Sequence, residues 1–254
     1  LSGKSLETVV VDTLHPRRGH AWPARLDVVQ SASGLLLALF MWFHMAFVST
    51  ILVSKDAFWT VARIFEGEFL FGEPIPALVS FIVALVWALV ALHALLALRK
   101  LPADWRQYRG YLLHTNAMRH SDTQLWSVQV VTGIVMLFLA SIHLYTMMIE
   151  PEAIGPYGSA DQVWSGRTWP LLLVLLLCVE IHGVTGLYRL ALKWGWPTFG
   201  SAARTRRILR RLMWGLMAFF ILLGLTTLLC FVSIGRDHAD RVGERYVPQA
   251  AVSP

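Results

Sequence analysis

The stretch LDVVQSASGLLLALFMWFHMAFVSTIL, residues 26–52, decides the fold class of this chain. It is almost entirely apolar and exceeds the roughly 20 residues that an α-helix needs to cross a bilayer. Beyond its first residues the only ionisable side chain is His44. Because ionisable groups are costly in hydrocarbon and are usually kept there for a function, the stretch predicts a transmembrane helix with a functional histidine.

Four more apolar stretches follow, and together they predict five transmembrane helices, at about 26–53, 75–98, 122–149, 168–190 and 210–235. Of the 254 residues, 56% are hydrophobic, above the roughly 45–50% of soluble domains. We therefore expect an all-α membrane bundle that forms one domain over residues 1–254. The first residues lack a basic region followed by an apolar run, so we expect no cleavable signal peptide.

The net charge of +6 is explained by membrane topology and not by a nucleic-acid partner. If the N-terminus is cytoplasmic, sixteen Lys and Arg residues lie in inner segments and six in outer ones. This positive-inside bias predicts an N-terminus in the cytoplasm and a C-terminus outside. The same basic face could bind anionic lipid or an acidic partner.

Four histidines lie inside the predicted spans, at His44, His93, His143 and His182. At a rise of about 1.5 Å per residue, His44 and His143 lie roughly 27–30 Å from the inner ends of their helices, and His93 and His182 roughly 9–10 Å from theirs. Two imidazoles at matched depth suit bis-histidine ligation of a haem. We therefore predict two haems b between the first four helices, an outer and an inner one. A single di-metal site does not fit, because Glu-x-x-His pairs are absent.

An internal repeat supports this pairing. Residues 30–44 (QSASGLLLALFMWFH) and 129–143 (QVVTGIVMLFLASIH) share the pattern Q-x-x-[ST]-G-x9-H. Gly34 and Gly133 lie at about the depth of the inner pair, and we expect them to let a porphyrin approach the backbone. Small-residue packing between helices is the alternative explanation.

Polar side chains at the inner ends of the helices are candidates for binding the anionic haem propionates. Ordinary anchoring at the membrane interface is the alternative for each of them, because aromatic and basic residues prefer that level. The candidates are Gln30, Ser31, Lys100, His120, Trp126 and Lys193.

Two carboxylates are candidates for proton transfer. Glu180 lies roughly 14 Å from the inner end of its helix, where an ionisable group indicates a proton relay or a neutral acid bonded to a neighbouring helix. Glu66 lies in AFWTVARIFEGEFLF, residues 57–71, which predicts an interfacial amphipathic helix or a re-entrant piece. A carboxylate there suits a base that accepts protons from a quinol, although spacing alone does not distinguish it from Glu68 and Glu73.

The remaining histidines and the cysteines carry no predicted chemistry. The two cysteines lie inside spans without paired spacing, which indicates buried apolar thiols and supports neither a disulfide nor an iron–sulfur cluster. The histidines outside the spans lie in polar segments, where we expect them to be solvated. These residues are Cys178 and Cys230, and His15, His20, His114 and His238.

The chain resembles the dihaem cytochrome b subunit of succinate:quinone oxidoreductases, above all the single-subunit anchor of bacterial menaquinol:fumarate reductases. The resemblance runs from about Leu26 to Trp196, and the N-terminal segment and the tail after about residue 200 match weakly. Besides residues 26–52, it is carried by ALHALLALRK (91–100), MRHSDTQLW (118–126), TGIVMLFLASIHLYTMM (132–148) and VEIHGVTGLYRLALKWGW (179–196).

The resemblance implies a multi-pass protein of the bacterial inner membrane in which the four histidines are the axial haem ligands. It implies menaquinol oxidation near the outer haem, with Glu66 as proton acceptor, and transmembrane proton movement through Glu180. The implied partners are an iron–sulfur subunit and an FAD-containing flavoprotein on the cytoplasmic face, which reduce fumarate to succinate. It leaves open whether the complex is a dimer of heterotrimers.

Three alternatives remain at this point. The same subunit could work in reverse, as part of a succinate:quinone reductase. A cytochrome b anchor of a hydrogenase or formate dehydrogenase would also hold bis-histidine haems in a helical bundle. A haem-free assembly anchor would use the histidines only to bond helices to one another.

Overall fold

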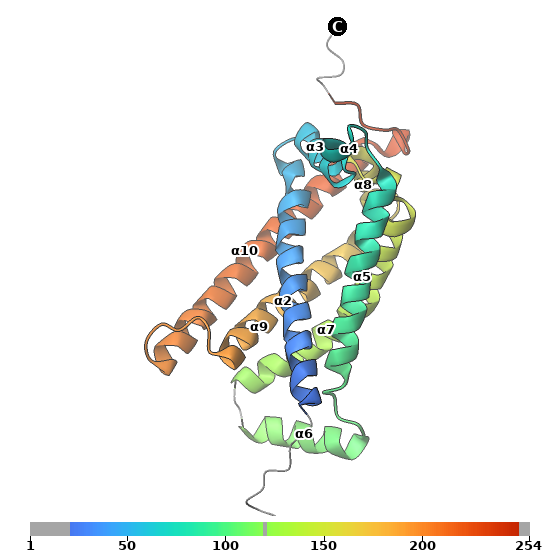
Figure 1. Cartoon of the computed structure of the whole chain (residues 1–254). Helices are drawn as coiled ribbons and strands as arrows, with labels where there is room; N and C mark the ends of the chain where they lie inside the picture. The colour runs from blue at the N-terminus through green and yellow to red at the C-terminus, as the bar shows by residue number, and fades with distance from the viewer. Residues whose placement is uncertain (1–20, 119–120, 249–254) are drawn as a thin grey trace, which may run out of the picture.

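The computed structural model describes residues 21–118 and 121–248, and these are all helical apart from short connections (Figure 1). His120, one of the predicted propionate residues, lies outside them. The elements are α2 (Trp22–Val48), η1 (Ser49–Leu52), α3 (Lys55–Phe65), α4 (Glu68–Phe71), α5 (Pro76–Leu98), α6 (Trp105–Met118), α7 (Ser121–Ile149), η2 (Pro151–Ala153), α8 (Pro156–Trp164), α9 (Trp169–Trp194), α10 (Ala202–Asp237) and η3 (Ala239–Arg241).

Five helices are long and apolar enough to cross a membrane: α2 with η1, α5, α7, α9 and α10. They confirm the expected helices, except that α10 begins at Ala202 and not near residue 210. Their outward side chains are exposed, Leu36, Phe43, Leu95 and Phe138 among them. Large exposed apolar surfaces of this kind are suited to lipid, so the chain is a membrane protein.

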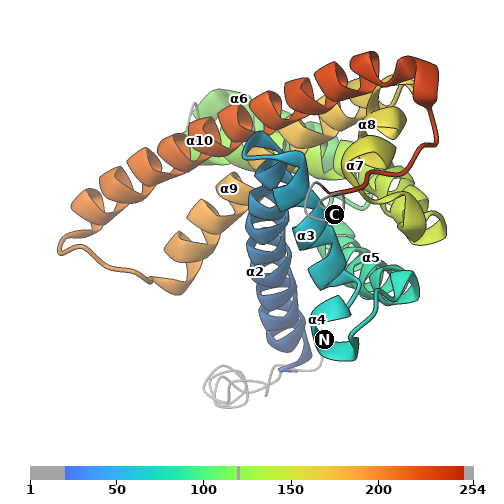
Figure 2. The ribbon, with the colours of Figure 1, turned by 90° about the horizontal axis from the view of Figure 1, so that it is seen from above.

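Four of the five long helices form a closed ring. α2 packs on α5, α5 on α7, α7 on α9, and α9 on α2. α10 lies outside this ring, mainly against α9, and the view from above shows α9 between α10 and α2 (Figure 2). Each ring helix carries one of the four intramembrane histidines, so the ring faces all four toward a common interior.

Local sequence signals set the ends of these helices. α2, α5 and α9 each have a proline in their first turn, where the missing N–H costs no hydrogen bond. α9 ends at Gly195, which adopts the left-handed backbone conformation (φ 65°) common at helix ends. α10 is capped at its N-terminus by Ser201, whose hydroxyl accepts a hydrogen bond from the Arg204 N–H.

The two ends of the bundle differ. One end holds the start of α2, the end of α5 and the start of α10, with α6 lying across it, and is here called the basic end (Figure 1). The opposite end, called the Glu66 end, is covered by α3, α4, α8 and the C-terminal tail (Figure 1). α3 and α4 form the expected amphipathic segment. α6 and α8 lie in connections where we expected no helix.

Candidate functional site

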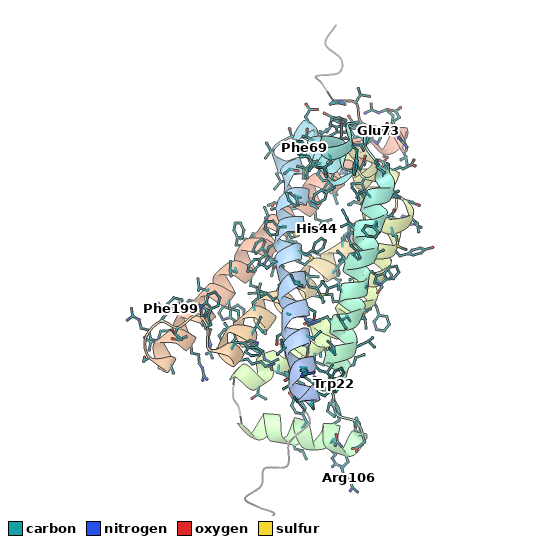
Figure 3. All side chains as sticks on the ribbon, in the orientation of Figure 1. Trp22, His44, Phe69, Glu73, Arg106 and Phe199 are labelled. Carbon is teal, nitrogen blue, oxygen red and sulfur yellow. The ribbon has the colours of Figure 1, made fainter. Side chains whose placement is uncertain are left out.

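The structure brings the four histidines together as two pairs. His44 of α2 and His143 of α7 have ring centroids 6.3 Å apart and ring planes at 62°. His93 of α5 and His182 of α9 have centroids 6.4 Å apart and planes at 86°. His44 lies on the side of the bundle nearer to Phe69 than to Trp22 (Figure 3), and the pair that it forms with His143 is here called the outer pair.

The spacing within each pair fits a metal ion between the rings. An imidazole nitrogen binds a metal at about 2.0–2.1 Å and lies about 1.1 Å from the centroid of its own ring. Two rings on opposite sides of one metal then have centroids about 6.3 Å apart. Among the described residues no cluster of three His, Cys, Asp or Glu side chains occurs. A haem needs only two protein ligands, because its porphyrin supplies the others, so the donor set fits haem.

The inner rings are oriented by hydrogen bonds at Nδ1. Nδ1 of His182 is 2.8 Å from the carbonyl oxygen of Gln129. Nδ1 of His93 lies 3.1 Å from the hydroxyl of Ser33, which itself donates to the Gln30 carbonyl at 3.1 Å. The Gln129 carbonyl can only accept, and the Ser33 hydroxyl gives its hydrogen to the Gln30 carbonyl, so Nδ1 carries the proton in each ring and Nε2 is left free to bind a metal.

Gly34 and Gly133 lie against the inner rings themselves. A Cβ built on Gly34 would lie 2.8 Å from Cε1 of His93, and one on Gly133 would lie 2.8 Å from Cε1 of His182. The expectation from sequence was that these glycines make room for a porphyrin. In the structure the group that approaches the backbone is the imidazole of the facing helix.

A cavity of about 470 Å³ surrounds the inner pair. This volume lies in the range of ordinary cofactor and ligand pockets, roughly 300–1,000 Å³. Most of its lining is apolar, and polar groups gather toward the basic end. The predicted propionate residues among the described ones all line it, namely Gln30, Ser31, Lys100, Trp126 and Lys193.

Asp27, which we did not single out from sequence, pairs with two of the lysines that line this cavity, Lys100 and Lys193. Its carboxylate bonds Arg99 at 2.8 Å, Lys100 at 2.9 Å and Lys193 at 3.5 Å. One carboxylate thus joins the ends of α2, α5 and α9 and leaves a surplus of positive charge beside the cavity. A surplus of this sign suits the binding of a carboxylate group. Each of these ion pairs is exposed and contributes little to stability alone.

Glu180 of α9 also lines the cavity, deep inside the bundle. Its side chain is 2% exposed, and its Oε1 has no hydrogen-bond partner among the described residues. A buried polar atom without a partner is costly and indicates a group kept for a function or bonded to something outside the protein chain.

Glu66 lies at the opposite end, at the turn between α3 and α4. It is 1% exposed, whereas Glu73 is exposed, so burial distinguishes it from its neighbours. Oε1 accepts a 2.7 Å hydrogen bond from Arg63, and Oε2 is buried without a partner among the described residues. Burial raises the pKa of Glu66, although the Arg63 guanidinium acts in the opposite direction.

The expectation that His238 is solvated is wrong. Its side chain is 1% exposed, its Nδ1 is 2.9 Å from Oδ1 of Asp161, and Tyr157 stacks on its ring. The sequence shows only a histidine in a polar tail. The fold buries it because α8 and the end of α10 pack together at the Glu66 end.

Comparison with known proteins agrees with this geometry. Residues 106–225 match the family model described as succinate dehydrogenase/fumarate reductase transmembrane subunit. The chain is similar to the fumarate reductase cytochrome b subunit of Wolinella succinogenes, with 47% identity over 88% of each chain. It is also similar to the fumarate reductase cytochrome b subunit of Helicobacter pylori strain J99, with 46% identity over 85% of this chain and 84% of the relative.

The two relatives align with 88% and 85% of this chain. Identity near one half over such a length is far above what a shared fold alone would give. The chain therefore belongs to the family of succinate dehydrogenase/fumarate reductase transmembrane subunits and, within it, to the fumarate reductase cytochrome b subunits.

Proposed function

We propose that this chain is the dihaem anchor of a fumarate reductase that oxidises menaquinol at the Glu66 end and relays electrons toward the basic end. The observation that carries the proposal is the spacing of two histidine pairs on four ring helices, with centroids 6.3 Å and 6.4 Å apart. The relatives' name, cytochrome b subunit, supports haem b as the group that these pairs hold.

His44 and His143 would bind the outer haem, and His93 and His182 the inner one. When bound, the two haems supply one-electron carriers between the ends of the bundle. The His93 ring lies beside Gly34, ten residues before His44, so the two pairs are roughly 15 Å apart along α2. The residues proposed to hold the inner propionates are Gln30, Ser31, Lys100, Trp126 and Lys193, with His120 as a further candidate.

Proton transfer would use the two buried carboxylates. Oxidation of a quinol releases two protons with its two electrons, and a base must accept them. Glu66 has an unpartnered oxygen at the interface, which supports its assignment as that base. Glu180 has an unpartnered oxygen beside the inner cavity, which supports its role as a proton relay within the bundle.

The basic end would face the bacterial cytoplasm, as the positive-inside bias predicts, with the N-terminus on that side. An iron–sulfur subunit and an FAD-containing flavoprotein would dock there and carry the fumarate site. The relatives' names favour fumarate reduction over succinate oxidation, and the family assignment argues against an anchor of a hydrogenase or formate dehydrogenase.

The test is to purify the complex and record reduced-minus-oxidised spectra of the parent and of single histidine variants. We expect two b-type haems in the parent, loss of only the outer one in His143→Ala, and loss of only the inner one in His93→Ala. A parent complex without b-type bands would refute the proposal. Fumarate-dependent menaquinol oxidation in liposomes, abolished by Glu66→Gln with both haems retained, would test the assignment of the base.

A further inference from the structure

Besides a histidine, the two copies of the internal repeat share a glutamine, a serine or threonine, and a glycine at equivalent positions. The first five residues of each copy, 30–34 in α2 and 129–133 in α7, lie beside the rings of the inner pair, which come from α5 and α9. The carbonyl of Gln129, the first residue of the second copy, bonds Nδ1 of His182 at 2.8 Å. The carbonyl of Gln30, the first residue of the first copy, accepts from the Ser33 hydroxyl, which lies 3.1 Å from Nδ1 of His93. In each copy the fifth residue, a glycine, touches Cε1 of the same ring.

Helix geometry explains why these two positions act together. In an α-helix the carbonyl of residue i points toward the N–H of residue i+4 and keeps a second lone pair for another donor. A side chain at i+4 would cover that lone pair on the ring's side. With Gly133 at i+4, the His182 imidazole can approach the Gln129 carbonyl and keep its hydrogen bond. With Gly34 at the same position, the His93 imidazole can approach the Ser33 hydroxyl that donates to the Gln30 carbonyl.

The two copies differ at the fourth position, which is Ser33 in α2 and Thr132 in α7. The Ser33 hydroxyl is 3% exposed, lies 3.1 Å from Nδ1 of His93, and donates to the Gln30 carbonyl at 3.1 Å. The Thr132 hydroxyl bonds the carbonyls of Val128 and Gln129. Within the part of the chain that the structure describes, it makes no hydrogen bond to His182.

We propose that segments 30–34 and 129–133 are paired cradles that fix the rotation of the inner haem's two ligands, and that Ser33, as the acceptor at Nδ1–H, makes His93 a stronger electron donor. The inference rests on the proposed haem ligation. An acceptor at Nδ1–H increases the basicity of a metal-bound imidazole. A more basic ligand favours ferric over ferrous iron, so Ser33 lowers the reduction potential of the inner haem and is a positioning residue.

The first experiment compares Ser33→Ala with the matched variant Thr132→Val in the purified complex. Redox titration of the haem absorbance should show an upward shift of one midpoint, that of the haem lost in His93→Ala, in Ser33→Ala only. Thr132→Val should keep both midpoints of the parent. An unshifted midpoint in Ser33→Ala, or an equal shift in both variants, would overturn the role of Ser33.

The second experiment adds a methyl group to each cradle. Gly34→Ala and Gly133→Ala place a Cβ 2.8 Å from a ring carbon, closer than carbon atoms pack, so the ring must rotate or move. The low-spin ferric EPR signal depends on the angle between the two imidazole planes. We expect the inner haem's signal to shift or disappear in both variants while the outer haem's signal is unchanged.

Gly215→Ala is the control, because it makes the same change on α10, where a Cβ meets no atom within 4 Å. This variant should keep the EPR signals of both haems. If Gly34→Ala and Gly133→Ala match this control, the cradles are refuted, although the ligation stands. If His93→Ala leaves both haems in place, the proposed ligation itself fails, so the two failures are distinguishable.

Discussion

Only one of the two oxygens of the Glu66 carboxylate has a hydrogen-bond partner among the described residues. Arg63 Nη2 bonds Oε1 at 2.7 Å, and Oε2 is buried with no partner among the described residues. Arg63 itself lies over the ring of Trp59, which limits its movement. One fixed oxygen and one free oxygen suit a base that must receive a proton from a bound quinol in a defined direction.

Arg63→Met should change the pH dependence of menaquinol oxidation. Burial raises the pKa of Glu66, and loss of the opposing guanidinium should raise it further. Because the base must be deprotonated, the rate falls as pH drops through this pKa, so the acidic limb of the rate profile should move to higher pH. The profile is measured with the intact complex in liposomes.

Arg245→Gln is the comparison for this variant. Arg245 also acts on Glu66 electrostatically, but its side chain is exposed and pairs with Glu152 at 3.1 Å, so solvent screens it. The acidic limb of the rate profile should move less in Arg245→Gln than in Arg63→Met. An unchanged limb in Arg63→Met would show that Glu66 is not the group whose protonation limits the reaction.

At the scale of elements, the turn between α3 and α4 positions Glu66. Gly67 begins α4 in the left-handed conformation (φ 80°), and the Ile75 N–H donates to the Glu66 carbonyl at 2.8 Å. This turn folds α4 back and closes the chain over the carboxylate. Gly72 ends α4 with a similar conformation (φ 78°) but lies in open space.

Gly67→Ala should therefore lower the quinol oxidation rate more than Gly72→Ala. Both changes place a side chain in the left-handed region, at a cost of roughly 1–2 kcal/mol. Only at Gly67 would the new Cβ also lie 2.9 Å from side-chain atoms of Leu78 and Phe71, so only there must the turn or these two side chains shift. Equal rates in the two variants, with equal haem content, would contradict this account.

At the scale of the whole molecule, hydrogen bonds hold the C-terminal tail against the Glu66 end. Asp161 of α8 accepts from the Gly243 N–H at 3.1 Å and pairs with His238 at the end of α10. Tyr246 in the tail donates to Asp56 of α3 at 2.8 Å. These contacts join α3, α8 and α10 outside the ring that carries the histidines.

His238→Ala should destabilise this end without removing haem. It leaves the carboxylate of Asp161 buried with fewer partners, a loss of about 1–3 kcal/mol, measured as a lower thermal unfolding temperature of the complex in detergent. The double variant, Asp161→Asn with His238→Ala, should lose less stability than the sum of the losses in the two single variants, because the residues are in contact. Glu152→Ala, at an exposed ion pair, should leave the unfolding temperature unchanged.

The five helices and the depths of the four histidines could be predicted from the sequence because both depend on quantities counted along the chain. Hydrophobic length fixes which segments cross a bilayer, and a constant rise per residue fixes how deep each side chain lies. α6 and α8 were not predicted, since short polar helices carry little hydrophobic signal. His238 was misjudged for a related reason, because its burial comes from α8 and not from its own neighbours in sequence.

The sequence by itself determined the membrane class, the four histidines and their sorting by depth, since each is a property of a single helix. The tertiary structure alone decided which atoms meet. It brought the Ser33 hydroxyl to His93 and the Gln129 carbonyl to His182, placed Gly34 and Gly133 against those rings, and separated the buried Glu66 from the exposed Glu73. The physical reason is that depth is set along a helix, whereas contact depends on how helices rotate and pack against one another.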